Sequence, residues 1–181
     1  MRRRLLIGLG TLPFLVLAVA LPKLAVVPDN EMAPTLLAGD VILVLPETPA
    51  AGDVVALFDP LDPRRWTLRR IETIGGAVRY EDGVFHTGGD RESVVEMGVE
   101  GAFHVLRQEG HLVRQSARAV HWEMDEAGVA DDAAFVSADA RDEAVDSRWW
   151  GPIPLTALRG VVRLRLSPPG HPWRGWLTTA P

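Results

Sequence analysis

The stretch FVSADARDEAVDSRWWGP, residues 135–152, decides how the rest of the chain is interpreted. Its apolar start belongs to the segment Ala134 to Ser137, which predicts a β-strand. Aspartates and arginines follow as far as Arg148, before the stretch closes on Trp-Trp-Gly-Pro. Aspartate and arginine form charge-assisted hydrogen bonds, so we expect these side chains to pair and to hold a loop in place.

Short segments rich in β-branched and aromatic residues, separated by Gly, Pro and Asp, recur before and after this stretch. Such a pattern favours an all-β domain. The acidic, Ala-rich segment Ala117 to Asp132 predicts either a short helix or a loop, and Gly75-Gly76 predicts a turn. The other expected strands are Asp40–Leu45, Val54–Phe58, Thr67–Ile71, Ala77–Tyr80, Gly83–His86, Phe103–Arg107, Leu112–Arg114 and Leu158–Leu166.

The composition limits the possible functions. The chain has 181 residues, of which 47% are hydrophobic, and this size suits one folded domain. A formal net charge of −5 argues against nucleic-acid binding through a basic surface. Cysteine is absent, which excludes disulfides and thiolate chemistry. Lysine occurs once, as Lys23, so every other basic side chain is an arginine.

The amino terminus predicts a membrane anchor. Three arginines at positions 2–4 precede an uncharged apolar run, Leu5 to Pro22, which approaches the length of about 20 residues that a transmembrane helix needs. Residues 24–27 could extend this helix beyond Lys23. Because arginines stay on the cytoplasmic side, we expect residues 1–26 to form a cytoplasmic basic tip and a single-pass anchor in the inner or plasma membrane.

Residues 27–181 then form a periplasmic or extracellular domain. An alternative is a cleavable secretory signal, because Ala18-Val19-Ala20 has the small-x-small pattern that follows an apolar core. Both alternatives place the domain outside the cytoplasm.

Three segments resemble signal peptidase I, the family of membrane-anchored leader peptidases that use a Ser/Lys dyad. Residues 28–36 and Gly39-Asp40 are similar to the family's Pro-Ser-x-Ser-Met-x-Pro-Thr-Leu and Gly-Asp. The segment from Gly52-Asp53 to Arg69-Arg70-Ile71 is similar to one that ends in Lys-Arg-Val. Residues 138–151 follow Gly-Asp-Asn-Arg-Asp-Asn-Ser-x-Asp-Ser-Arg-x-Trp-Gly with identity at eight of its fourteen positions.

The resemblance implies a signal-peptidase-type antiparallel β domain behind one amino-terminal transmembrane helix. It also implies a cleft that binds an extended polypeptide as an added β-strand. The family's architectural positions are kept in this sequence, and they are Met32, Pro34, Gly39, Asp40, Asp139, Arg141, Asp142, Asp146, Ser147, Arg148 and Gly151.

The positions that match the family's dyad are changed. Glu31 stands at the place of the serine, and a carboxylate cannot form the usual acyl-enzyme ester. Arg69 stands at the place of the lysine, and a guanidinium stays protonated and cannot act as a general base. Lys23 cannot replace it, because it lies at the membrane end of the anchor. The sequence therefore excludes a Ser/Lys dyad.

Two supporting positions are also changed. Asp29 replaces a serine that the resemblance assigns to the oxyanion hole, and Ala144 replaces a serine that orients the lysine. Since Glu31 and Arg69 replace two residues that touch in the family, we hypothesise that they form an ion pair across the old active site. The alternative is that both side chains are solvated and unpaired.

Other chemistry has weaker support. A Ser-His arrangement would need one of His86, His104, His111, His121 and His171 to meet one of Ser93, Ser116, Ser137, Ser147 and Ser167. A carboxylate mechanism would need Glu31 to activate water with Asp29 as the acid. Neither metal-ligand spacing nor a glycine-rich phosphate loop occurs, so we expect no metal and no cofactor.

These residues together predict a non-catalytic, membrane-anchored homologue of signal peptidase I. It would bind an extended protein segment, or act as an accessory or assembly subunit in secretion or in a membrane complex. The alternatives are an active signal peptidase with an unrecognised catalytic set, and a degenerate copy without a retained role.

Overall fold

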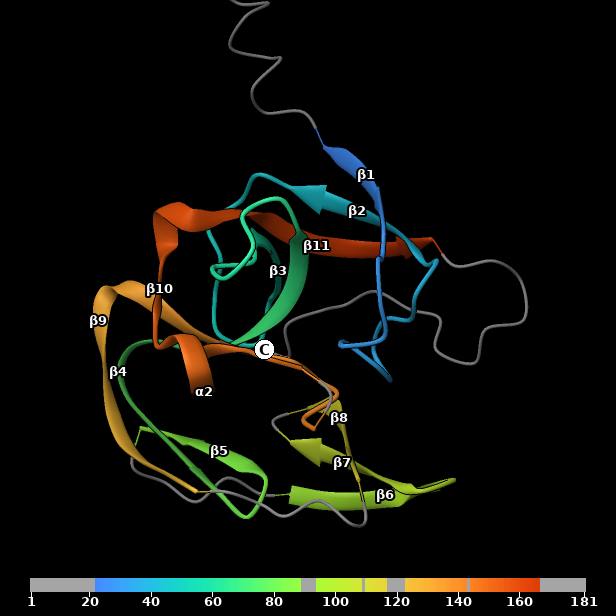
Figure 1. Ribbon diagram of the computed structural model, residues 1–181, viewed down its shortest axis with the longest axis vertical. Coiled ribbons are helices and arrows are strands. Elements are labelled where there is room, and N and C mark those ends of the chain that lie inside the picture. The colour runs from blue at the N-terminus through green and yellow to red at the C-terminus, as the bar shows by residue number, and fades with distance from the viewer. Residues whose placement is uncertain (1–21, 89–93, 109, 117–122, 143, 167–181) are drawn as a thin grey trace, which may run out of the picture.

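A computed structural model describes residues 22–88, 94–108, 110–116, 123–142 and 144–166. Almost every element is a β-strand, which confirms the mainly β fold, and the strands form two antiparallel sheets (Figure 1). The strands are β1 Lys23–Val26, β2 Val41–Leu45, β3 Val54–Phe58, β4 Trp66–Glu81, β5 Val84–Thr87, β6 Val94–Glu100, β7 Phe103–Gln108, β8 His111–Ser116, β9 Met124–Ser137, β10 Ile153–Pro154 and β11 Leu158–Leu166. The helical turns are α2 Ser147–Trp150 and η1 Leu155–Ala157.

The larger sheet has the order β1-β2-β11-β3-β4-β9-β10, with β5 paired to β4. Strand β2 packs through one face, because side chains alternate along a strand and Ile42 and Val44 are buried while their neighbours are half-buried. These two side chains pack with Met32, Leu36 and other apolar residues in one core cluster. The smaller sheet, β6-β7-β8, lies in the lower part of the view of Figure 1, at the height of β5.

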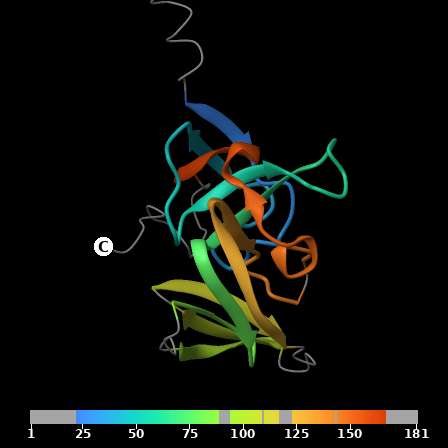
Figure 2. The same ribbon diagram turned by 90° about the vertical axis from the view of Figure 1, so that its left-hand side faces the viewer.

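Strands β4 and β9 are much longer than the others and run together as an arm toward the smaller sheet (Figure 2). Their register extends from Arg70 opposite Ser137 to Tyr80 opposite Met124. The glycine pair at residues 75 and 76 lies inside β4 at a register shift and has positive φ in both residues. The turn predicted there is wrong, because the two glycines form an irregularity within one continuous strand.

Other sequence predictions need correction. The segment Ala117 to Asp132 was expected to be helix or loop, but its residues 124–132 form the first part of β9, which pairs with β4 between Met124 and Val129. Residues 117–122 lie outside the described residues. Acidic and alanine residues carry low β-propensity, and pairing with β4 outweighs it. The segments Val54–Phe58 and Leu158–Leu166 form strands with the predicted bounds.

The residues at the end of the predicted anchor form a strand and not the expected extension of a helix. Lys23–Val26 forms strand β1, paired antiparallel with β2, so residues 24–27 do not extend a helix. The apolar run that predicts the transmembrane helix lies outside the described residues except for Pro22. Within the described part of the chain, no helix has the length and apolar character needed to cross a bilayer.

Candidate functional site

The connection between β1 and β2 forms one side of the candidate site. Its turn is fixed by the Asp29 carboxylate, whose Oδ1 accepts a hydrogen bond from the Glu31 backbone N–H at 3.0 Å. Met32 is buried in the core directly after this turn. The Glu31 carbonyl accepts a hydrogen bond from the Ala140 N–H at 2.9 Å, so the β1–β2 connection is also bonded to the loop after β9.

The beginning of β4 forms the opposite side of the candidate site. Side chains alternate along a strand, so Thr67 and Arg69 share one face while Arg70 points to the opposite face. The pairing of β4 with β3 directs the backbone groups of Trp66 and Leu68 away from β3. Strand β9 pairs with β4 only from Arg70 onward, so no described strand lies beside the backbone of Trp66 and Leu68 on that side.

An ion pair between Glu31 and Arg69 joins the β1–β2 connection to the beginning of β4. Glu31 Oε2 lies 2.8 Å from Arg69 Nη2, and the Arg69 side chain is 1% exposed. The same guanidinium donates to Thr67 Oγ1 at 2.7 Å and to the Leu68 carbonyl at 2.6 Å. This confirms the hypothesis of an ion pair and rejects the alternative of two solvated side chains.

A second arginine joins this ion pair from the loop between β3 and β4. Arg65 Nη2 lies 2.8 Å from Glu31 Oε1 and 2.9 Å from Asp29 Oδ2. The hydrogen bond that Arg65 donates to Glu31, followed by the one it donates to Asp29, raises the pKa of Arg65 above its ordinary value. Both carboxylates are therefore paired with arginine side chains.

The fourth changed position lies on the loop that follows β9. The residue after Ala144, Val145, accepts a hydrogen bond from Arg69 Nη2 through its carbonyl at 2.8 Å. The structure thus brings Asp29, Glu31 and Arg69 together, and holds the backbone next to Ala144 against the same guanidinium.

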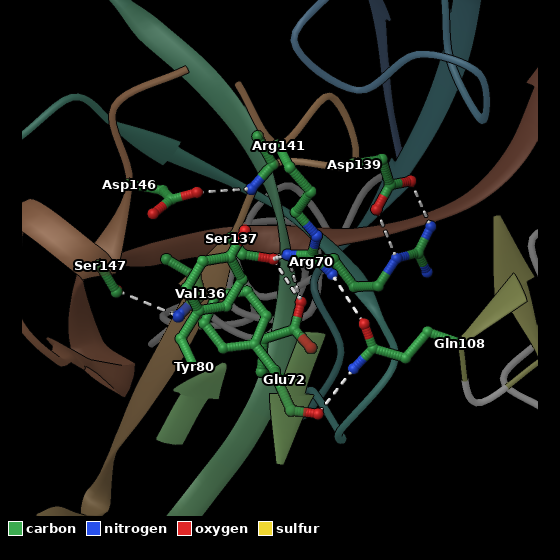
Figure 3. A network of polar contacts seen from close by, with 12 residues as sticks. Arg70, Glu72, Tyr80, Gln108, Val136, Ser137, Asp139, Arg141, Asp146 and Ser147 are labelled. Carbon is green, nitrogen blue, oxygen red and sulfur yellow. Dashed lines mark hydrogen bonds and ion pairs between the residues drawn. The ribbon is translucent and has the colours of Figure 1, made fainter. Parts of the chain in front are cut away.

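On the opposite face of β4, Arg70 and Asp139 form a buried bidentate pair (Figure 3). Arg70 Nε and Nη2 lie 2.8 and 2.7 Å from the two Asp139 oxygens. Burial favours the protonated acid, but the charge and hydrogen bonds of Arg70 outweigh it and hold the pKa of Asp139 below its ordinary value. This pair joins the beginning of β4 to the loop after β9.

A second buried network lies farther along β4. Arg141 Nη1 is 3.1 Å from Glu72 Oε1, and the Ser137 hydroxyl contacts both side chains (Figure 3). Arg141 also lies over the Phe85 ring at 4.5 Å from its centroid. Glu72 gave no signal in the sequence, since a lone carboxylate in a β-rich segment predicts a solvent-exposed position.

The other architectural residues also stabilise loops. Asp146 caps α2 and pairs with Arg148 at 2.8 Å, as the sequence predicted for this loop. Asp139 and Arg141 instead find partners on β4, outside their own motif. The remaining members of the set are Asp40, paired with Arg165; Asp142, bonded to the Ser116 N–H; Ser147, which accepts from the Val136 N–H; buried Met32 and Pro34; and Gly39 and Gly151, both at positive φ.

Next to the ion pairs is an open apolar pocket of about 580 Å³. It is lined by Pro60, Leu61, Val145, Trp149 and Trp150. Arg69 connects the two features, because its guanidinium lies 5.3 Å from the centroid of the Trp150 ring. Leu61 and Trp149 are strongly exposed, which is unusual for such large apolar side chains.

The Ser-His alternative gains nothing from the two buried serines. Ser137 is bonded to Glu72 and Arg141, and Ser147 Oγ is bonded to the Val136 N–H. Ser93, Ser167, His121 and His171 lie outside the described residues. In the described part of the chain, no group of three or more His, Asp or Glu side chains is placed to hold a metal.

Sequence reasoning also missed Arg65 and Thr67. Arg65 lies in an Asp- and Pro-rich loop beside Arg64, and nothing in the sequence distinguishes the two arginines. Only the course of the loop shows that Arg65 is the one that reaches the site.

An antiparallel β domain, with a Met-x-Pro turn facing the start of β4 and a buried Asp-Arg pair behind it, defines the class of protein. The family model for signal peptidase, peptidase S26, matches residues 2–167, so the chain belongs to this family. This confirms the resemblance found in the sequence. No curated protein matches the chain significantly.

Proposed function

We propose that this protein is a non-catalytic member of the signal peptidase family that binds an extended polypeptide segment at the outer face of a membrane. The observation that carries the proposal is the ion pair of Glu31 with Arg69, at the two positions that match the family's nucleophile and base. A guanidinium held by Glu31, Thr67 and Leu68 cannot accept a proton from a nucleophile.

The backbone of β4 supports the binding role. Trp66 and the Leu68 N–H direct peptide groups toward a side on which no described strand lies, while the Leu68 carbonyl accepts from Arg69. An extended segment can add to such an edge through main-chain hydrogen bonds, while pockets take alternate side chains. The apolar pocket at Leu61 and Trp150 is suitable for one of these side chains. The protein would thus serve as an accessory or assembly subunit, anchored through its amino terminus.

The test is cleavage of a preprotein in liposomes by the full chain and by two variants. The first variant carries Asp29→Ser, Glu31→Ser, Arg69→Lys and Ala144→Ser, and the matched control carries the three serine substitutions but keeps Arg69. We expect no cleavage by the wild type or the control, and cleavage at a small-x-small site by the first variant, because only that variant has a lysine base. Cleavage by the wild type would overturn the proposal.

A further inference from the structure

The Arg65 guanidinium lies where three carboxylates converge. Asp29 and Glu31 bind it at 2.9 and 2.8 Å, and Asp59 Oδ2 lies 3.7 Å from its Nη1. These carboxylates come from two separate parts of the chain, because Asp29 and Glu31 precede β2 while Asp59 follows β3. The site is therefore a receptor for one cationic group, and in this structure the cationic group belongs to the chain itself.

The two arginines of the cluster are held very differently. Arg69 is 1% exposed and bonded on several sides, whereas the Arg65 side chain is 43% exposed. Exposed ion pairs contribute little to stability because water competes for both partners. If the Arg65 side chain turns outward, Glu31 keeps its ion pair with Arg69 while Asp29 and Asp59 lose the guanidinium that they share, so the site becomes more negative.

The loop that carries Arg65 can keep its shape when this side chain moves. Its turns are closed by the backbone, since the Asp59 N–H donates to the Arg65 carbonyl and the Arg65 N–H to the Asp62 carbonyl, both at 2.9 Å. The Leu61 N–H donates to Asp59 Oδ1 at 2.8 Å. Pro60 and Leu61, from the same loop, line the apolar pocket.

We propose that the candidate site selects a segment with an arginine or lysine side chain, whose cationic group replaces Arg65 on Asp29 and Glu31. This rests on the proposed binding of an extended segment. An apolar side chain of the same segment enters the pocket beside Leu61 and Trp150. Arg65 thus acts as an internal placeholder, which neutralises the carboxylates until the segment arrives.

The experiment measures binding of labelled ten-residue peptides to the full chain in detergent, by fluorescence anisotropy. The peptides share a Val- and Ala-rich sequence and differ at one central residue, which is arginine, its uncharged isostere citrulline, or glutamate. We expect the arginine peptide to bind the wild type roughly fivefold more tightly than the citrulline peptide, with the glutamate peptide weakest. Glu31→Gln combined with Asp29→Asn should abolish this preference.

The decisive variant is Arg65→Ala, with Arg64→Ala as the matched control for loss of one positive charge on the same loop. Arg65→Ala should bind the arginine peptide about fivefold more tightly than the wild type, with the citrulline peptide unchanged. Arg64→Ala should behave as the wild type. Equal binding of all three peptides, or an equal gain in Arg64→Ala, overturns this inference and leaves the binding function standing. Failure of every peptide to bind overturns both.

Discussion

Glu31 and Arg69 lie 38 residues apart in the sequence, yet their side chains meet at 2.8 Å between the β1–β2 connection and the beginning of β4. Arg69 is buried, so its charge depends on this carboxylate and on nearby oxygens for stabilisation. A buried charge that loses its partner is strongly destabilising. The stability of the fold therefore depends on this contact.

Glu31→Gln should destabilise the protein. We expect a loss of about 2 kcal/mol in the free energy of unfolding, less than for a fully isolated charge, because Arg69 keeps the Leu68 and Val145 carbonyls. Urea unfolding of the full chain in detergent measures it, with exposed Glu126→Gln as the control. An equal effect of the two substitutions would show that the ion pair contributes nothing.

Asp139→Asn should lower the free energy of unfolding more than Glu31→Gln does. Asp139 is fully buried and binds Arg70 through both oxygens, so an amide leaves the Arg70 charge without its counter-charge. We expect a loss of about 3 to 5 kcal/mol in the free energy of unfolding. The control is exposed Asp125→Asn, and a loss of under about 1 kcal/mol would contradict the interpretation.

The network at Glu72 gives a test by double substitution. Glu72→Leu alone should cost about 3 to 5 kcal/mol, because it leaves Arg141 charged in the core. Adding Arg141→Leu removes that charge, and the double variant should be more stable than Glu72→Leu. Urea unfolding of the wild type, Glu72→Leu, Arg141→Leu and the double variant measures the coupling. Additive losses would mean that the two side chains do not interact.

His111 should make stability depend on pH. Burial, and secondarily the charge of Arg70, lower the pKa of His111 from 6.5 to about 4. Between these values the unfolded chain binds a proton that the folded chain does not, so stability is complete above pH 6.5 and falls as the pH falls. The loss should approach about 3 kcal/mol near pH 4.

The measurement for His111 is the free energy of unfolding between pH 7 and 5, compared with His111→Gln. This window stays above the range in which carboxylates such as Asp139 take up protons. The variant should show a shallower decline with falling pH than the wild type. Parallel curves for the two proteins would exclude His111 as the cause.

Local pattern predicted many of the strands but not their continuity. The strands Val54–Phe58 and Leu158–Leu166 were predictable because apolar runs between breakers identify buried strands. The two segments predicted on either side of Gly75-Gly76 form the single strand β4. Strand β1 was not predicted, because its four residues, mostly apolar, follow directly on the apolar run of the predicted anchor and resemble it in composition.

The sequence by itself determined which side chains are available for chemistry, because this depends on residue identity alone: Lys23 is the one lysine, residue 31 is a glutamate and residue 69 is an arginine. The tertiary structure decided which charges meet. Arg65 rather than Arg64 reaches Glu31, and Glu72 rather than an aspartate of the motif neutralises Arg141. Pairing between distant charges has no periodicity along the chain, since it depends on where strands and loops place two side chains in space.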